Sequence, residues 1–362
     1  MPTEEHPIDV AVIGAGQAGL AAGYFLRRAG ADFVILDAAD RPGGSWPLYW
    51  DSLRLFSPAA HSMLPGWWMP EEEGHEYPSA AHVASYLSAY ERRYDLPVHR
   101  PARVRRAERA DGLLRLHTDT GTWLARRVIS ATGTWNAPHT PDVPGRDVFA
   151  GTQLHTADYR GPQEFTGQRV VVVGGGNSAA QILAELSTVA TTTWATARPP
   201  RFLPDDIDGR ALFAIATRAQ QAAGRRASEQ QGVAGLGDIV VVPSVREARE
   251  RGALKAEPMF ARLSRTGVVW ADGTTLECDV VLWCTGFRPV LDHLGSLAPL
   301  DEHGQMAVEG TRSVAEPRLH LLGYGDWTGA ASATLIGAAR TAKATVAQIT
   351  GELEHEARTG TA

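Results

Sequence analysis

Two glycine-rich segments of the dinucleotide-binding type occur in this chain, GAGQAG at Gly14–Gly19 and GGGNSA at Gly174–Ala179. Each follows a short apolar segment and opens a segment with helical periodicity. Because one such strand, loop and helix binds one adenine dinucleotide, two of them predict two Rossmann-type domains with two cofactors. The simplest pair is FAD with NADPH or NADH.

The first loop has the full context of a dinucleotide-binding unit. Gly14 is expected to make the tight turn, Gly16 to admit a pyrophosphate, and Gly19 to let the next helix pack closely. Asp37 ends the unit, where its carboxylate can accept hydrogen bonds from a ribose. The expected elements are a strand over Asp9–Ile13, a helix over Leu20–Ala29 and a strand over Asp32–Leu36. The alternative, a glycine-rich turn that serves only helix packing, does not explain the terminal acid.

The second dinucleotide-binding unit differs from the first at its end. The expected elements are a strand over Arg169–Val173, a helix from Ser178 and a strand over Thr191–Thr196, and Ala179 replaces the third glycine. No acid comes after the last strand, which argues against strict NAD specificity. Arg198 and Arg201 lie there instead and can hold the 2′-phosphate of NADPH, because a guanidinium group matches phosphate oxygens. The alternative is a solvated basic loop.

Composition excludes several classes of protein. The chain has 362 residues, enough for two domains of ordinary size, and is 44% hydrophobic and 21% charged. The net charge of −6, without a basic run, gives no reason to expect nucleic acid. The short acidic N-terminus and the lack of a long apolar run predict a cytoplasmic protein that does not bind membranes. A homodimer is left open.

The two cysteines, Cys278 and Cys284, are too widely spaced along an extended segment to form a disulfide. We expect buried thiols without a redox function. Disulfide reductases, which need a close pair such as CxxC beside the flavin, are therefore excluded. No cluster of metal-ligating residues stands out, and no metal is expected.

The fold class expected from these elements is α/β, with two Rossmann-like domains of which the FAD domain is discontinuous. The predicted domains are 1–150 (FAD domain, first part), 151–283 (NAD(P)H domain) and 284–362 (FAD domain, second part). The remaining expected elements are a helix over Ala81–Arg93, an antiparallel meander over Arg103–Ser130, a helix and loop over Ala211–Gly237 and a helix over Ala331–Ile349.

The segment FAGTQLHTADYR, Phe149–Arg160, resembles the fingerprint FxGxxxHxxxY of the class B flavin-dependent monooxygenases and lies between the two nucleotide loops. Similar motifs cover nearly the whole chain: GGSW at Gly43–Trp46, ISATG at Ile129–Gly133, CTGFRP at Cys284–Pro289 and GYGD at Gly323–Asp326. The chain is most similar to the short bacterial members that oxygenate sulfides and some ketones with NADH or NADPH. A neighbouring group is linked to arsenic resistance.

The resemblance implies an activity. NAD(P)H would reduce FAD, the reduced flavin would form a C4a-(hydro)peroxyflavin with O₂, and this would oxygenate small soft nucleophiles, thioethers to sulfoxides, or ketones in a Baeyer-Villiger reaction. The partners are then a small-molecule substrate and O₂. The alternatives are an NAD(P)H oxidase or arsenic-linked flavin oxidoreductase and, less favoured, a flavin-binding redox sensor without turnover.

The resemblance also implies roles for residues. Asp326 would bind the FAD ribityl chain, with a helix N-cap as the alternative, and Trp46 would lie near the flavin, with a core position as the alternative. His155 is expected to brace the linker between the domains. The further cofactor-binding residues expected are Gln17, Gly44, Ser45, Thr132, Gly133, Gly174, Gly176, Asn177, Ser178, Thr285 and Gly286.

Two positions depart from the larger members of the family. Phe56 occupies the place of an Asn that contacts flavin and substrate, and a phenyl ring cannot donate that hydrogen bond. We expect a shorter-lived oxygenating flavin with more H₂O₂ released, and Ser57 or Tyr49 as partial substitutes. Ala197 replaces an Arg that binds the 2′-phosphate, so NADPH and NADH are expected to be used without strong preference.

Aromatic residues are concentrated in the loop after the first unit. Phe56 is as consistent with lining an apolar substrate pocket as with packing the loop, and packing is favoured for Trp67 and Trp68.

Overall fold

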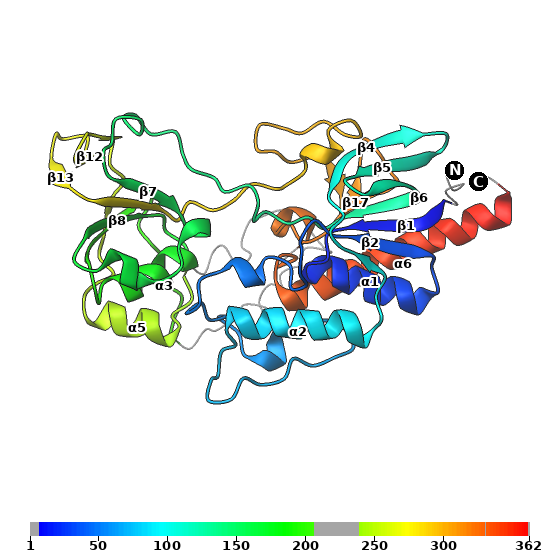
Figure 1. Cartoon of the computed structure of the whole chain (residues 1–362), viewed down its shortest axis with the longest axis horizontal. Coiled ribbons are helices and arrows are strands. Elements are labelled where there is room, and N and C mark those ends of the chain that lie inside the picture. Colours follow the sequence, from blue (N-terminus) through cyan, green and yellow to red (C-terminus); the bar gives the residue numbers. More distant parts are fainter. Residues whose placement is uncertain (1–6, 206–238, 330, 361–362) are drawn as a thin grey trace. The chain divides into compact units, whose positions relative to one another are not determined.

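The computed structural model describes residues 7–205, 239–329 and 331–360, and its contacts divide the chain into two compact units (Figure 1). Unit 1 comprises residues 1–47, 58–137 and 288–362, and unit 2 comprises residues 48–57 and 138–287. The chain passes from one unit to the other after residues 47, 57, 137 and 287, whereas the predicted domain boundaries are at 150 and 283. Residues 48–57 belong to unit 2. The helix and loop expected over 211–237 lie outside the described residues.

Unit 1 is built on a mixed sheet whose central strands are parallel. Its order is β15-β16-β17-β6-β1-β2-β3, and the pairs from β17 to β3 are parallel. The strands are β1 (Ile8–Ile13), β2 (Phe33–Leu36), β3 (Val98–His99), β6 (Gly121–Ser130), β15 (Val308–Glu309), β16 (Arg312–Ser313) and β17 (Leu319–Leu321). β1 lies between β2 and β6, so the chain leaves β1 at the point where the strand order reverses.

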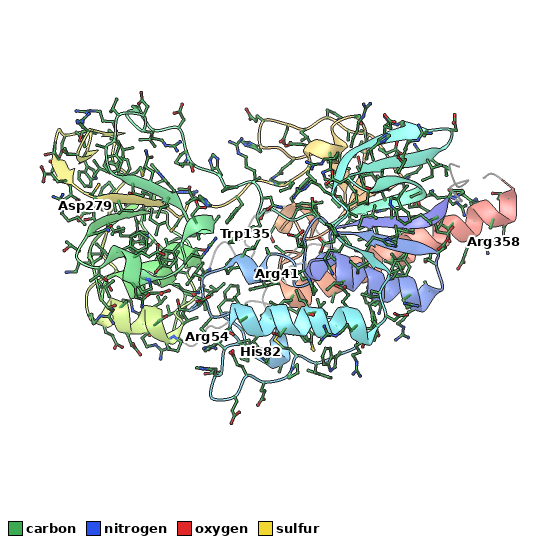
Figure 2. All side chains as sticks on the ribbon, viewed as in Figure 1. Arg41, Arg54, His82, Trp135, Asp279 and Arg358 are labelled. Carbon is green, nitrogen blue, oxygen red and sulfur yellow. The ribbon has the colours of Figure 1, made fainter. Side chains whose placement is uncertain are left out.

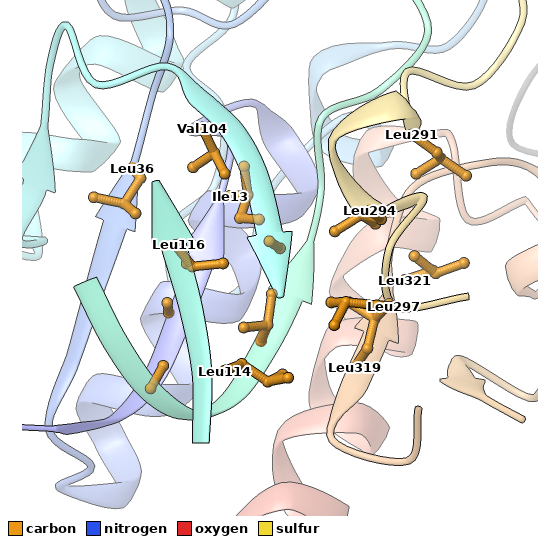
Figure 3. Close-up of a cluster of buried hydrophobic side chains, with 14 of the residues drawn as sticks. Ile13, Leu36, Val104, Leu114, Leu116, Leu291, Leu294, Leu297, Leu319 and Leu321 are labelled. Carbon is orange, nitrogen blue, oxygen red and sulfur yellow. The ribbon is translucent and has the colours of Figure 1, made fainter. Parts of the chain in front are cut away.

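The antiparallel meander expected over residues 103–130 is present. β4 (Val104–Ala110) pairs with β5 (Leu113–Thr118), which pairs with β6. Apolar residues of the meander pack with those of the parallel strands and of the segment after residue 290. Figure 3 shows this core, which includes Ile13, Leu36, Val104, Leu114, Leu116, Leu291, Leu294, Leu319 and Leu321. The core holds the carboxyl ends of the strands in fixed register.

Three helices accompany this sheet: α1 (Gln17–Ala29), α2 (Ala80–Arg93) and α6 (Leu335–Thr359), with α1 packed against α6. α6 begins and ends later than the expected 331–349. Ala331 has a positive φ of 57°, which is outside the helical region, and the Thr334 side chain caps the helix by accepting from the Gly337 N–H. The helix then continues to Gly360, which adopts the left-handed conformation that ends many helices.

Unit 2 contains a parallel sheet of order β10-β9-β8-β14-β7. Its strands are β7 (Thr152–His155), β8 (Arg169–Val173), β9 (Thr191–Thr196), β10 (Ala256–Pro258) and β14 (Val280–Trp283). The α-helices among the described residues of the unit are α3 (Asn177–Leu186) and α5 (Pro243–Glu250). A small antiparallel sheet of β11 (Arg262–Leu263), β12 (Gly267–Val269) and β13 (Thr275–Glu277) packs beside it. Strands β8 and β9 have the predicted bounds.

The structure confirms the α/β fold class with Rossmann-like parallel sheets in both units. Among the described helices, none is both long and apolar enough to cross a membrane.

Candidate cofactor sites

The first glycine loop lies where β1 ends next to the turn after β6. Gly14 has a φ of +100°, and a Cβ there would lie 2.6 Å from the carbonyl oxygen of Ala131. A Cβ on Gly19 would lie 1.8 Å from the carbonyl oxygen of Gly14. The turn and the close helix packing expected from the sequence therefore both require the absence of a side chain.

Gly16 behaves differently, because a Cβ there would meet nothing within 4 Å. Gly16 is the N-cap of α1, and its cap lacks a side-chain hydrogen bond. The cap therefore gives the first N–H groups of α1 no side-chain acceptor, and the space at the Gly16 Cβ position is open, which suits an anionic pyrophosphate. Gly44 borders this space, since its Cβ would lie 2.9 Å from the Gly16 Cα, and its φ is +60°. These residues fit a dinucleotide phosphate.

Gln17 joins three segments of unit 1 beside this loop. Its Oε1 accepts a hydrogen bond of 3.1 Å from Trp46 Nε1, and its Nε2 donates one of 2.5 Å to the carbonyl oxygen of Ala333. The glycine loop, the GGSW segment and the turn before α6 thus meet at one amide. Trp46 is half-buried. Two segments expected to contact FAD, the glycine loop and the GGSW segment with Ser45, are thereby joined to the turn before α6.

Tyr324 is a residue of this site that the sequence did not reveal. Its hydroxyl lies 2.7 Å from Thr132 Oγ1 and accepts a hydrogen bond of 3.1 Å from the Thr132 N–H. Thr132 Oγ1 also lies 2.6 Å from the Val290 carbonyl oxygen, to which it can donate. Gly133, the next residue, has a φ of +66° and accepts at its carbonyl from the Val290 N–H. The turn after β6 is therefore fixed from two sides.

Two acids that are expected to bind FAD also have partners within the protein. Asp326 opens a short 3₁₀ helix, Asp326–Thr328, and accepts a hydrogen bond of 3.2 Å from the Ala331 N–H. Asp37 is buried and forms an ion pair of 2.8 Å with Arg100, whose other nitrogens bind Glu91. Arg100 lies 63 positions from Asp37 in the sequence, so the pair could not be found from local spacing.

The second glycine loop has the same construction in unit 2. Gly174 has a φ of +132°, and a Cβ would lie 2.2 Å from the carbonyl oxygen of Cys284, in the turn after β14. Gly176 is the N-cap of α3 without a side-chain hydrogen bond, and a Cβ there would again meet nothing within 4 Å. Ala179, in place of a third glycine, is fully buried. The loop thus leaves the same open space as the first.

The predicted residues around the second loop differ in their burial and in the hydrogen bonds that the structure shows. Asn177 Oδ1 accepts a hydrogen bond of 2.8 Å from the Val240 N–H, which holds the segment that enters α5. Ser178 is half-buried in the first turn of α3. Arg198 and Arg201 are exposed after β9, and the Arg201 carbonyl accepts from the Ile239 N–H. Their guanidinium groups lie on the same short segment.

His155 contacts a segment that connects the units. Its Nδ1 accepts from the Ala157 N–H at 3.1 Å, which places the proton on Nε2, and Nε2 donates to the Gly286 carbonyl at 2.9 Å. Burial lowers the pKa of His155, so the ring is neutral near pH 7. Thr285 Oγ1 donates to the His139 carbonyl at 2.5 Å, and His139 lies on the other segment that connects the units, next to Pro138, which pairs antiparallel with Phe287. These contacts agree with a bracing role for His155.

Candidate catalytic residues Tyr49, Phe56 and Ser57 are half-buried and belong to the segment 48–57 of unit 2. Trp67 and Trp68, further along the loop, belong to unit 1. Trp67 packs on Tyr86 of α2 with a centroid distance of 5.1 Å, whereas Trp68 is 66% exposed. Packing is therefore the role of Trp67, as the sequence favoured.

The thiols fit the exclusion of disulfide chemistry. Both cysteines are free, and burial raises the pKa of Cys278 to about 11 and that of Cys284 to about 12. Cys284 is only half-buried by its exposed surface, but either thiol is protonated at neutral pH. In the part of the chain that the structure describes, no group of acids, histidines and cysteines could hold a metal ion.

Comparisons with known proteins agree with this geometry. Residues 11–203 match the family model described as pyridine nucleotide-disulphide oxidoreductase. A flavin-containing monooxygenase from Stenotrophomonas maltophilia has a similar structure, with a TM-score of 0.87 and 52% identity, over 96% of this chain and 99% of that one. An uncharacterized CzcO-like oxidoreductase of Geobacillus kaustophilus is 30% identical over 84% of this chain and 90% of its own length. Indole-3-pyruvate monooxygenase YUCCA1 of rice is 28% identical over 76% of each chain.

Proposed function

Because the chain belongs to the pyridine nucleotide-disulphide oxidoreductase family, and within it to the flavin monooxygenases, we propose that it oxygenates small soft nucleophiles with NAD(P)H and O₂. Thioethers are the main substrate class, and ketones are a second. The observation that carries the proposal is the pair of open glycine-capped helix N-termini, one at each parallel sheet, in a chain without a close cysteine pair.

The reaction balances without any further reactant. NAD(P)H, a proton, O₂ and a thioether give NAD(P)⁺, water and a sulfoxide. Bound FAD supplies the two-electron chemistry that joins hydride transfer to O₂ activation. The protein has to bind both dinucleotides, orient their rings and exclude water.

Residues of unit 1 are assigned to FAD in this proposal. The N–H groups at Gly16 and Gln17 receive the pyrophosphate, Asp37 faces the ribose of the adenosine, and Asp326 faces the ribityl chain. Gly44, Ser45, Trp46, Thr132 and Gly133 border the same space. The support is that the contacts of Gln17 and Tyr324 gather these segments at one end of the sheet.

Residues of unit 2 are assigned to the nicotinamide dinucleotide. The N–H groups at Gly176, Asn177 and Ser178 receive its pyrophosphate, and Arg198 and Arg201 bind the 2′-phosphate of NADPH. Thr285 and Gly286 lie in the turn next to Gly174. Tyr49, Phe56 and Ser57 are proposed to act on the substrate side. The enzyme is proposed to work in the cytoplasm, and a homodimer is the assembly to test first.

The deciding experiment is anaerobic reduction of the FAD-loaded protein with NADPH and with NADH, followed by mixing with O₂ and a thioether. We expect each NAD(P)H oxidised to yield one sulfoxide, except for a fraction that yields H₂O₂ instead. The oxygen atom of the sulfoxide should come from labelled O₂. Full return of the electrons as H₂O₂ without sulfoxide would overturn the proposal and favour the NAD(P)H oxidase or arsenic-linked oxidoreductase. If neither NADPH nor NADH reduces the flavin, the result would favour a redox sensor.

A further inference from the structure

One carboxylate fastens the segment 48–57 to the second dinucleotide-binding unit. Glu185 Oε1 accepts a hydrogen bond of 3.0 Å from Trp50 Nε1, and Glu185 Oε2 accepts one of 2.7 Å from Ser52 Oγ. Glu185 lies on α3, more than 130 positions away in the sequence. The segment has no α-helix or β-strand of its own within its ten residues, so side-chain contacts such as these contribute to holding it in place.

The surroundings make this contact specific. Trp50 is only 1% exposed, and its ring meets that of Tyr159 edge-on at 5.9 Å. Tyr159 in turn stacks on Phe165 at 5.7 Å. The Trp50 side chain is therefore buried, and a buried indole N–H that loses its acceptor is strongly unfavourable. Burial likewise raises the pKa of Glu185, against the hydrogen bonds from Ser52 and Trp50.

The same helix begins at the second glycine loop. α3 starts at Asn177, directly after the open N-cap Gly176, and Glu185 lies about two turns further along the helix. A helix of this length moves as one body. The segment 48–57, which contains Arg54 labelled in Figure 2, is therefore attached to the element that receives the nicotinamide dinucleotide, although it lies between two parts of unit 1 in the sequence.

We propose that Glu185 is a positioning residue that ties the segment carrying Tyr49, Phe56 and Ser57 to α3, so that these side chains follow the nicotinamide-binding domain. The inference rests on the proposed function for the role of these three residues. It assigns no contact with a cofactor to Glu185 itself. The carboxylate acts through Trp50 and Ser52.

Glutamate is the side chain that this arrangement requires. Its two oxygens accept from two donors at once, whereas a glutamine amide offers only one acceptor oxygen. Glu185→Ala removes both acceptors. Trp50→Phe keeps an aromatic ring against Tyr159 but removes the N–H, and Ser52→Ala removes the other donor at an exposed position. The matched control is Glu247→Ala, an exposed acid on α5.

Hydrogen exchange of the FAD-loaded full chain tests the anchor without relying on turnover. We expect Glu185→Ala and Trp50→Phe to speed amide exchange in residues 48–57 by about tenfold, because local opening becomes easier. Exchange in β8 and α1 should stay at the wild-type rate, as should the whole pattern in Glu247→Ala. Unchanged exchange of 48–57 in Glu185→Ala would overturn the proposal. If Glu185→Ala unfolds globally, Ser52→Ala tests the anchor instead. We expect a smaller increase in the exchange rate, confined to residues 48–57.

Steady-state kinetics then test the positioning. In Glu185→Ala we expect the KM for the thioether to rise and the sulfoxide formed per NADPH to fall by about threefold to tenfold, with the anaerobic rate of flavin reduction unchanged. Faster exchange of 48–57 with unchanged KM and sulfoxide yield would overturn the positioning role. If the wild-type enzyme makes no sulfoxide, the proposed function fails, and the exchange experiment still decides whether Glu185 anchors the segment.

Discussion

The Tyr324 hydroxyl lies 2.7 Å from Thr132 Oγ1 and 2.9 Å from Ser130 Oγ, so one phenol joins the ends of β17 and β6. Tyr324 and Ser130 are 194 positions apart in the sequence. The motifs ISATG and GYGD are thereby parts of one structure beside the first glycine loop. Tyr324 is almost fully buried, and burial raises the pKa of its hydroxyl. It is therefore a neutral hydrogen-bonding group at every physiological pH.

Tyr324→Phe is predicted to destabilise this edge of unit 1. The Thr132 N–H and two hydroxyls lose a buried partner, which costs about 1–3 kcal/mol. We expect a lower free energy of unfolding in urea and weaker FAD binding, measured by flavin fluorescence titration. Tyr94→Phe, which leaves these contacts intact, is the control. Wild-type affinity and stability in Tyr324→Phe would show that the hydroxyl has no such role.

The two glycines of the first loop are predicted to respond differently to alanine. A Cβ on Gly19 would overlap the Gly14 carbonyl, so Gly19→Ala should lower the free energy of unfolding by about 3 kcal/mol or more. Gly16 has a φ of −78° and open space, so Gly16→Ala should change the stability of the apoprotein by less than about 1 kcal/mol.

Gly16→Ala is predicted to weaken FAD binding although it leaves the apoprotein stable. The new methyl group of Gly16→Ala would occupy the space proposed for the pyrophosphate, and we expect FAD affinity to fall by at least about tenfold. Urea unfolding of the apoprotein and flavin titration measure the two effects separately. Full FAD affinity in Gly16→Ala would contradict the proposed site.

The two dinucleotide-binding units could be predicted from the sequence because their strands, turns and helices depend on residues that are neighbours in the chain. The alternation of apolar strand, glycine loop and helix placed β8 and β9 correctly, and the turn signals placed the meander. The start of α6 was wrong by a few residues, since the left-handed Ala331 and the Thr334 cap leave only a weak sequence signal.

Long-range partners could not be predicted in the same way. Arg100 with Asp37, Tyr324 with Thr132 and Glu185 with Trp50 join residues whose spacing in the sequence carries no information about contact. The last pair is one of the contacts that attach residues 48–57 to unit 2. Two donors on a short loop and the one acid of α3 were the signal available.

Coenzyme preference is predicted to depend on the exposed arginines after β9. Arg198→Ala should raise the KM for NADPH by about tenfold and leave that for NADH nearly unchanged, because only NADPH carries the 2′-phosphate. Arg262→Ala, an exposed arginine of β11, is the control. In the wild type we expect the two coenzymes to differ by less than about a hundredfold in kcat/KM. Equal losses for both coenzymes in Arg198→Ala would exclude phosphate recognition.

Acid sensitivity is predicted from two buried histidines of unit 1. Burial lowers the pKa of His293 and of His320 to about 4. Between that value and the ordinary histidine pKa near 6.5, the unfolded chain binds more protons than the folded one, so stability falls as the pH falls. Each histidine contributes a slope of at most about 1.4 kcal/mol per pH unit.

His320→Gln isolates one of these contributions. Glutamine stays uncharged, so the variant should lose less stability than the wild type between about pH 6.5 and pH 5. Glu185 contributes a slope of stability against pH with the opposite sign, because burial raises its pKa and the folded state binds the proton more tightly than the unfolded state. This contribution is the same in the wild type and in His320→Gln. Urea unfolding at several pH values measures the difference. Parallel curves for the two proteins would mean that folding does not lower the pKa of His320.

Phe56 is predicted to limit the efficiency of oxygen transfer. A phenyl ring offers no hydrogen bond at the position where larger family members have an amide, so Phe56→Asn restores a donor. We expect Phe56→Asn to lower the H₂O₂ formed per NADPH oxidised by about twofold or more, with sulfoxide rising correspondingly. Phe56→Leu, which changes shape without adding a donor, is the control. Because Ser57 and Tyr49 lie on the same segment and carry hydroxyls, Ser57→Ala and Tyr49→Phe should increase H₂O₂ if either substitutes for the missing amide. An H₂O₂ yield that is the same in wild type and Phe56→Asn would show that the oxygen chemistry does not depend on a donor at this position.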